Sequence, residues 1–261
     1  MPIVTLDALR AYLGIPAGES AENPRLWAAL ETASSEAERY ANRRFMPYRA
    51  ARQQAVNSEG ELPLADDLLE LVAVTDSAGE ALALADLTAA PDAAPYDRLL
   101  RTDGGLLDAG VYSVTGVWGW QDGRTGAGWQ ASGQVSGGAL AAGDVLLSVP
   151  DAGAAGMGGA ALFEVGALLR LGDELVWVVA VDATLNRLTL SRAAQGTTAA
   201  AHAAGTAILR WQPAALVSGW VLRRAAGLYR APDGLALPAL DGDGLRGVRR
   251  LRRRVHRHRE G

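Results

Sequence analysis

Residues 111–120 read VYSVTGVWGW and form the most strand-like stretch of this 261-residue chain. β-branched and aromatic residues fill it, a composition typical of a β-strand. Shorter stretches of similar character lie at 50–57, 68–75 and 96–101, separated by Gly, Pro and Asp residues. The pattern predicts a small antiparallel sheet whose last strand ends in a Trp-Gly-Trp sequence.

Helices are predicted before and after these strands. A short helix over 6–13 has Thr5 as its N-cap and carries apolar residues at helical spacing. A longer helix over 24–43, capped by Asn23, has one apolar stripe that continues for about five turns. A third helix is predicted over 213–230, where apolar residues again recur at i, i+4 spacing.

Two stretches predict irregular structure. Residues 78–95 are rich in Ala, Asp and Pro and are expected to form a loop with at most a short helical turn. Residues 121–143 are rich in Gly, Ser and Gln, which indicates a mobile linker or long loop. A second β-rich unit is then expected over about 134–211. Its five short predicted strands suggest a small barrel or sandwich; they lie at 144–149, 162–171, 174–181, 186–192 and 206–211.

The composition excludes several kinds of chemistry. The chain has no Cys and no Lys, so all 25 basic residues are Arg. Disulfides, Cys-type zinc sites, Schiff bases and phosphate-binding loops that need a Lys are therefore excluded. The sequence also contains neither a secretory leader nor an apolar stretch of about 20 residues. We therefore expect a cytoplasmic-type protein with no membrane partner.

Charge is distributed unevenly along the chain. Residues 1–245 hold 17 Arg and 28 acidic residues, a formal charge of −11. Residues 246–261 hold eight Arg and one Glu, a formal charge of +7. An acidic body with a basic tail indicates an acidic partner for the tail. DNA phosphates, an acidic protein surface and simple solubility remain open explanations, and the tail itself could be a short helix or a disordered arm.

Candidate catalytic and metal-binding residues are few. His202 is the only His outside the last six residues, and we expect it to be a loop residue hydrogen-bonded to backbone. Asp173 and Glu174 fall at a hairpin corner and are expected to be solvated. Asp241 and Asp243 resemble the start of a calcium loop, but no acidic residue closes it. We therefore predict that the protein is not an enzyme and uses no metal and no cofactor.

Three tryptophans, Trp118, Trp120 and Trp129, lie close to Gly and Gln residues. Exposed aromatic rings in such a setting can stack on bases or sugars. Packing inside a β core is the commoner role, and we expect it here. A hydrolase or carbohydrate-binding enzyme is accordingly the weakest hypothesis, because the sequence offers no site for it.

The order of several motifs resembles that of tailed-phage head–tail connector (adaptor) proteins. Residues 3–15, IVTLDALRAYLGI, and 37–45, AERYANRRF, resemble the short and long helices at the start of that family. A strand with a Thr-Gly-x-Trp-Gly ending follows in the family and here at 115–119. A final helix introduced by Pro and closed by a Leu-Tyr-Arg-like sequence matches Pro213 and 228–230.

About 90 residues are inserted between Trp120 and Pro213 relative to small members of this family. The insert resembles a β module found in phage virion proteins. The similarity lies in LRLGDE at 169–174, LTLSR at 188–192 and GTTA at 196–199, followed by the further residues His202 and Gly205. The family pattern usually has Gly after the Arg, whereas this chain has Ala193.

The resemblance implies an α+β fold: a helical adaptor core of about three helices plus a small antiparallel sheet, with an inserted all-β small barrel or sandwich domain. It divides the chain into the first part of the core, the linker with the inserted domain, the C-terminal helix of the core, and the Arg-rich tail. These parts are 1–120, 121–211, 212–245 and 246–261.

The resemblance also implies a function. The expected protein is a structural virion subunit that forms a homo-oligomeric ring, a dodecamer in the family, beneath the portal protein. It would extend the DNA channel and join the capsid to a downstream connector or tail protein. The expected location is the virion head–tail interface, and the host cytoplasm during assembly. The alternative is a nucleic-acid-binding protein that uses the Arg-rich tail.

Two sets of residues are predicted to make these contacts. The portal-binding set is the basic residues of the tail, Arg246, Arg249, Arg250, Arg252, Arg253, Arg254, Arg257 and Arg259. The set between neighbouring subunits lies on the second and third predicted helices and consists of Leu26, Leu30, Trp220, Arg223 and Arg224.

Overall fold

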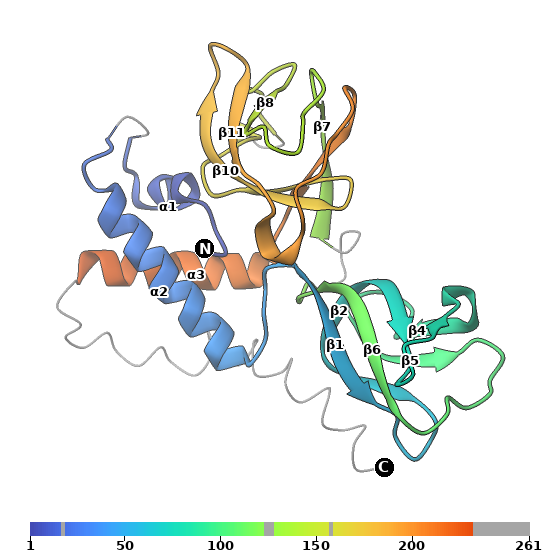
Figure 1. Cartoon of the computed structure of the whole chain (residues 1–261). Helices are drawn as coiled ribbons and strands as arrows, with labels where there is room; N and C mark the ends of the chain where they lie inside the picture. Colours follow the sequence, from blue (N-terminus) through green and yellow to red (C-terminus); the bar gives the residue numbers. More distant parts are fainter. Residues whose placement is uncertain (17–18, 123–127, 157–158, 232–261) are drawn as a thin grey trace. The chain divides into compact units, whose positions relative to one another are not determined.

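The computed structural model describes residues 1–16, 19–122, 128–156 and 159–231. Within these segments the chain forms three α-helices and two antiparallel sheets of six strands each (Figure 1). The helices are α1 (Leu6–Leu13), α2 (Asn23–Ala41) and α3 (Ala215–Arg230). The first sheet contains β1 (Tyr48–Ala55), β2 (Leu62–Thr75), β3 (Ala81–Leu82), β4 (Leu87–Ala90), β5 (Tyr96–Arg101) and β6 (Val111–Trp118). The second contains β7 (Trp129–Val135), β8 (Leu146–Ser148), β9 (Leu168–Leu171), β10 (Glu174–Asp182), β11 (Arg187–Ser191) and β12 (Ala207–Trp211).

The predicted fold class is wrong. The described residues are mostly β, with 36% in strands and 23% in helices, so the chain is not a helical core with a small sheet. The first sheet is as large as the second and has a hydrophobic core of its own. The sequence underestimates it because several of its strands are short or poor in apolar residues.

Two compact units divide the described chain. One contains residues 1–43 together with α3, and the other contains residues 44–214 with both sheets. The predicted boundary near 120 falls between the two sheets, inside the second unit. The expected partition into an adaptor core and an inserted domain stays a prediction.

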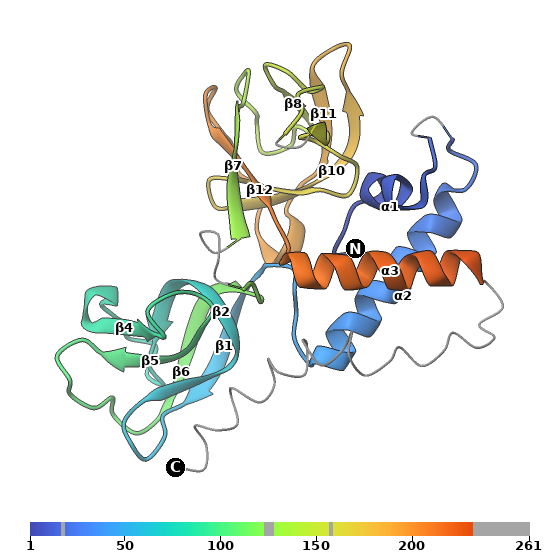
Figure 2. The ribbon, with the colours of Figure 1, turned by 180° about the vertical axis from the view of Figure 1, so that it is seen from behind.

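The helical unit is built from both ends of the described chain. α2 crosses α3, as both views show (Figures 1 and 2). Ala33 of α2 and Ala225 of α3 are fully buried, and small side chains of this kind allow helices to pack closely. α1 begins at the predicted cap, where the Thr5 hydroxyl accepts a hydrogen bond from the Ala8 N–H. The cap predicted for α2 is wrong, because Asn23 lies inside the helix and its side chain accepts a hydrogen bond from Arg10.

The first sheet has the strand order β1-β6-β2-β5-β4, and β3 pairs with β2. β2 is long enough to pair with two partners, with β5 along its first half and with β6 along its second. Register shifts along β2 bend it between these partners. The bend encloses a core that includes Leu68, Leu99 and Trp118.

The stretch 111–120 lies at the centre of this sheet, since β6 pairs with β1 on one side and β2 on the other. Trp118 is fully buried, and its indole N–H donates to the Ala50 carbonyl oxygen at 2.9 Å. A Cβ at Gly116 would lie 2.5 Å from the Glu70 carbonyl oxygen, so only glycine fits at this point, where β6 pairs with β2.

The second sheet has the strand order β7-β12-β9-β10-β11-β8. Alternate residues of its strands fill one core, among them Leu169, Leu171, Val176 and Val178. β7, the first strand in this order, lies in the predicted linker 121–143. β8, the last strand in the order, lies within the strand predicted over 144–149. All six strands pair antiparallel, as the short turns between apolar segments predict.

Two stretches predicted to be irregular contain strands. β7 lies within the expected linker 121–143 and pairs with β12, where Trp129 faces Trp211. The expected loop 78–95 holds β3, β4 and a 3-10 turn over Leu84–Asp86. The linker prediction fails at β7 because pairing with the distant strand β12 stabilises a strand whose own composition is weakly β-like. The loop prediction fails at β3 and β4, which pair with the neighbouring strands β2 and β5, but the short helical turn expected in this stretch is present. The Arg-rich tail over 246–261, for which a short helix and a disordered arm are both open, lies outside the described residues.

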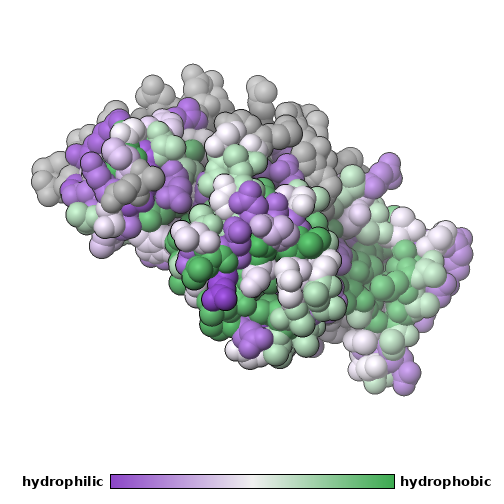
Figure 3. All heavy atoms as spheres, turned by 90° about the horizontal axis from the view of Figure 1, so that it is seen from above, coloured by the Kyte–Doolittle hydropathy of each residue, from purple (hydrophilic) through white to green (hydrophobic). Residues whose placement is uncertain are grey.

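Among the described helices, none combines the length and the apolar character that a membrane crossing requires. On the face of the molecule seen in Figure 3, apolar and polar residues are interspersed. Exposed apolar side chains do occur, including Leu146 at 53% and Leu185 at 59%.

Candidate functional site

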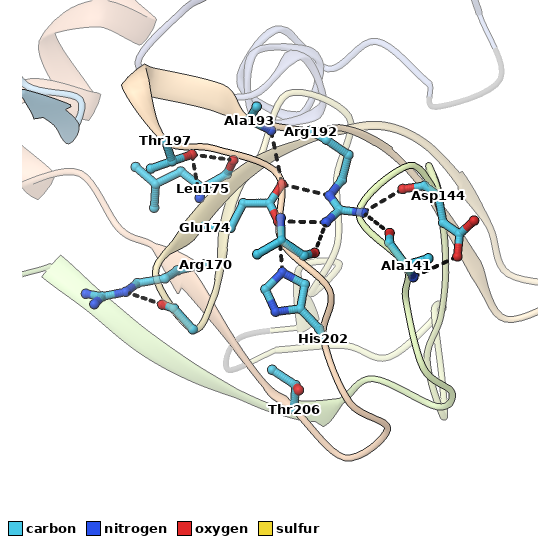
Figure 4. Close-up of polar contacts among 12 residues, drawn as sticks. Ala141, Asp144, Arg170, Glu174, Leu175, Arg192, Ala193, Thr197, His202 and Thr206 are labelled. Carbon is cyan, nitrogen blue, oxygen red and sulfur yellow. Dashed lines mark hydrogen bonds and ion pairs between the residues drawn. The ribbon is translucent and has the colours of Figure 1, made fainter.

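A cluster of polar side chains in the second sheet is centred on Glu174 (Figure 4). Glu174 is the first residue of β10 and follows the tight turn at Gly172, whose φ is 55°. The turn sends β10 back along β9, and pairing with β11 brings Arg192 beside Glu174. His202 reaches the cluster from a loop that is fixed by a two-way backbone bridge to Leu140.

The carboxylate of Glu174 is held by five nitrogen groups and has no exposed surface. Its Oε1 accepts from Arg192 Nε at 2.7 Å and from the Ala193 N–H at 3.0 Å. Its Oε2 accepts from Arg192 Nη2 at 2.7 Å and from the Ala200 N–H at 3.1 Å. His202 Nε2 lies 2.8 Å from the same oxygen.

The guanidinium of Arg192 is as fully bonded as the carboxylate that it faces. Beyond Glu174, its Nη1 donates to the carbonyl oxygens of Ala141 at 3.0 Å and Asp144 at 2.6 Å. Its Nη2 donates to the Ala200 carbonyl oxygen at 2.6 Å. Because a guanidinium has five N–H groups, these bonds use every one of them. The pair therefore fastens two loops to the ends of β10 and β11.

Electrostatics keep this carboxylate ionised. Burial alone would raise the pKa of Glu174, but the hydrogen bonds from Arg192, Ala193, His202 and Ala200 outweigh burial and lower the pKa to about 2. A carboxylate of this kind is a poor general base, since it holds a proton only in strong acid.

The surroundings of the cluster point to a structural role rather than to chemistry. A catalytic acid or base needs a hydrogen-bonding position left for substrate, and here the five donors fill the carboxylate. The nearby hydroxyl of Thr197 donates to the Ala194 carbonyl oxygen at 2.7 Å and accepts from the Leu175 N–H. These bonds cross-link backbone segments, and a fully satisfied polar network of this kind specifies one packing arrangement.

Sequence reasoning placed these residues wrongly. Asp173 and Glu174 were both expected to be solvated turn residues. Asp173 is solvated, with 79% of its side chain exposed, whereas the side chain of Glu174 is fully buried. His202 was expected to bond backbone with its ring, but the ring contacts the Glu174 carboxylate. A signal was present, because Glu174, Arg192 and His202 all lie in the segments whose order resembles a known β module. Their shared membership in one pattern could have indicated that they meet in space.

The predicted role of the tryptophans in packing is confirmed for Trp118 and Trp120, which are 0% and 6% exposed. Trp129 is partly buried and packs edge-on against Trp211, with ring centroids 5.2 Å apart. The guanidinium carbon of Arg170 also lies 5.9 Å from the centre of the Trp129 ring.

The residues predicted to lie between subunits have different positions in the helical unit. Leu26 and Leu30 are fully buried and Trp220 is 7% exposed, so these side chains pack inside the unit. Arg224 is half-buried and forms a bidentate ion pair with Glu36. Arg223 is exposed on α3, and its contact with a neighbouring subunit stays a prediction.

The remaining predicted residues lie outside the described segments. They are the eight Arg of the tail (Arg246, Arg249, Arg250, Arg252, Arg253, Arg254, Arg257 and Arg259) and the acidic residues Asp241 and Asp243. Within the segments that the structure covers, no three His, Cys, Asp or Glu side chains come together as metal ligands would.

Comparison with protein-family models and with curated proteins finds no match to this chain.

Proposed function

We propose that this protein is a structural subunit of a head–tail connector in a tailed-phage particle, where it binds beneath the portal and extends the DNA channel. The observation that carries the proposal is the order of elements along the chain. A short helix, a long helix, strands ending in Trp118-Gly119, and a last helix ending in Leu228-Tyr229-Arg230 follow one another as in that family.

The helical unit supports this proposal, because its first two helices and its last helix pack together although both sheets lie between them in the sequence. Arg224 and Glu36, 188 positions apart, form a bidentate ion pair at 2.5 and 2.8 Å. Nearer the C-terminal end of α3, Arg25 Nη2 donates to the Tyr229 carbonyl oxygen at 2.9 Å. Such a unit can present fixed surfaces on which copies of the chain assemble.

The Glu174 cluster also favours a structural role for the second sheet. Its donors and acceptors are used to fasten loops, which suits a module that has to keep its shape in an assembly. The charge distribution fits the same proposal. An acidic body repels DNA that passes it, and eight Arg in the tail offer charge-assisted contacts to an acidic portal surface.

The experiment is co-expression of the full chain with a portal protein from the same genome, followed by affinity capture, light scattering and negative-stain imaging. We expect the chain to bind the portal and to form a ring on it. A chain truncated after residue 245 should lose binding about tenfold or more, because it lacks the eight Arg of the tail. Replacing Arg187, an exposed residue of β11, by Gln is the matched control and should leave binding unchanged.

The nucleic-acid alternative predicts a different outcome from the same proteins. Duplex DNA would bind the full chain, binding would weaken steeply with salt, and truncation after residue 245 would abolish it. DNA binding of that kind without portal binding would reject the connector proposal. A chain that neither binds portal nor forms a ring on it would reject it as well.

A further inference from the structure

One basic residue of the second sheet, Arg170, forms an ion pair with an acidic residue of the first sheet. Arg170 lies in β9 between Leu169 and Leu171, both of which are fully buried in the core of the second sheet. Strand alternation therefore directs the Arg170 side chain away from that core. It is nevertheless only 17% exposed, because Glu70 of β2 and the ring of Trp129 lie against it.

The contact between Arg170 and Glu70 has the geometry of a strong ion pair. Arg170 Nη1 donates to one Glu70 carboxylate oxygen at 2.6 Å and Nη2 donates to the other at 3.1 Å. Nε donates to the Gly172 carbonyl oxygen at 2.8 Å, which fixes the guanidinium plane from within its own hairpin. Bidentate pairing of a pre-oriented Arg adds direction as well as attraction.

Two more contacts join the same two sheets. Asp173 follows that hairpin turn, and its Oδ2 lies 3.9 Å from Nη1 of Arg49 in β1, which forms an ion pair. Gly196, at the end of a 3-10 turn over Ala194–Gly196, has a φ of 79°, and a Cβ there would lie 2.2 Å from the Arg49 carbonyl oxygen. Backbone of the second sheet therefore touches backbone of the first, at a position where only glycine fits.

We infer that the Glu70–Arg170 pair is a latch that holds the two sheets as one rigid body. The Gly196 contact supplies the close fit and the ion pair supplies the attraction that keeps it closed. The inference is independent of the proposed function. Glu70 of β2 and Arg170 of β9 then control the orientation of the two sheets. When this ion pair is broken, the second sheet can reorient relative to the first while each sheet keeps its own fold.

The test measures the distance distribution between two spin labels on the full chain. The protein has no Cys, so Gln53→Cys in β1 and Ala180→Cys in β10, both at exposed positions, would be the only labelling sites. With the latch intact we expect a narrow distribution. Glu70→Gln should broaden it about twofold, because a neutral amide cannot form the charge-assisted pair.

A matched control uses the Arg101–Asp103 pair, which is also bidentate but closes a turn inside the first sheet. Asp103→Asn should leave the distribution narrow. Exchanging the charges, with Glu70→Arg and Arg170→Glu together, should narrow the distribution again and also shows that each sheet still folds. A distribution that stays narrow in Glu70→Gln and in Arg170→Gln, or that is already broad with the latch intact, would overturn the inference.

Discussion

Two Glu–Arg pairs of nearly identical geometry lie in very different surroundings in this protein. In the second sheet, Glu174 and Arg192 form two bonds of 2.7 Å with side chains that are 0% and 7% exposed. In the helical unit, Glu36 and Arg224 form bonds of 2.5 and 2.8 Å with side chains that are 28% and 19% exposed.

The comparison shows that bond length does not determine what an ion pair contributes. Water can solvate Glu36 and Arg224 when they separate, so breaking that pair has a modest effect. Glu174 and Arg192 have no such alternative, so removing one partner leaves a buried charge without compensation. We therefore expect single substitutions to have much larger effects in the second sheet than in the helical unit.

The largest effect is expected from Glu174→Gln. Breaking a buried pair by removing one charge costs about 3–5 kcal/mol, so the second sheet should lose most of its stability. Urea unfolding combined with hydrogen exchange of β10 and β11 measures this loss. Asp173→Asn, which changes the exposed neighbouring acid, is the control and should shift stability by about 0.5 kcal/mol or less. Equal effects of the two substitutions would refute the difference drawn between the pairs.

Acid should reproduce part of that effect without any substitution. The pKa of Glu174 is lowered from 4.5 to about 2, so the unfolded chain takes up a proton at a higher pH than the folded chain does. The stabilisation is fully present above about pH 5 and is lost as the pH falls toward 2, a change of about 3 kcal/mol. Unfolding of the wild-type chain and of Glu174→Gln between pH 6 and 2 measures it, and the variant should show the smaller pH dependence. Parallel curves for the two proteins would contradict the assignment to Glu174.

His202→Ala should have an intermediate effect. It removes one of five donors to a buried carboxylate, which typically costs about 1–2 kcal/mol. Thermal unfolding at pH 7 measures the difference. His258→Ala, in the tail, is the control for loss of an imidazole and should leave the midpoint unchanged. If both variants melt like the wild-type protein, His202 has no part in the cluster's stability.

Glu36→Gln should have the smallest effect. The Arg224 guanidinium lowers the pKa of Glu36, but both side chains are partly solvated, so the loss should be about 1 kcal/mol or less. Hydrogen exchange of α2 and α3 at low salt measures it, and at about 1 M salt the difference from wild type should shrink. A loss as large as that of Glu174→Gln would mean that burial does not separate the two pairs.

The helices and most strands of this fold can be predicted from local sequence. Thr5, the apolar stripe of α2 and the apolar spacing of α3 act within a few residues of one another, and the structure places these helices within two residues of their predicted bounds. β7 could not be predicted, because its residues WQASGQV are mostly exposed and form a strand through pairing with β12, more than 70 positions away. The balance between helix and sheet was wrong because several strands of the first sheet are short or poor in apolar residues.

The candidate site was harder to predict from the sequence than the fold. Glu174 resembles any acidic residue at a hairpin corner, and its burial depends on Arg192 and His202, which lie 18 and 28 positions further along the chain. Single-residue reasoning treats each of the three separately and so assigns each to solvent or backbone. Only the assembled second sheet brings them together, and the resemblance of 169–205 to a known β module was the one feature of the sequence that already grouped them.

The packing of α2 against α3 also sets the order in which the protein can fold during synthesis. Residues 1–41 are synthesised before both sheets, whereas their partner helix begins at Ala215, after both sheets have been made. Each sheet can close on contacts within its own stretch of chain, and protein units commonly fold in the order of their synthesis. α1 and α2 can therefore complete their packing only after α3 has been synthesised. The helical unit completes its fold after the two sheets that separate its parts in the sequence.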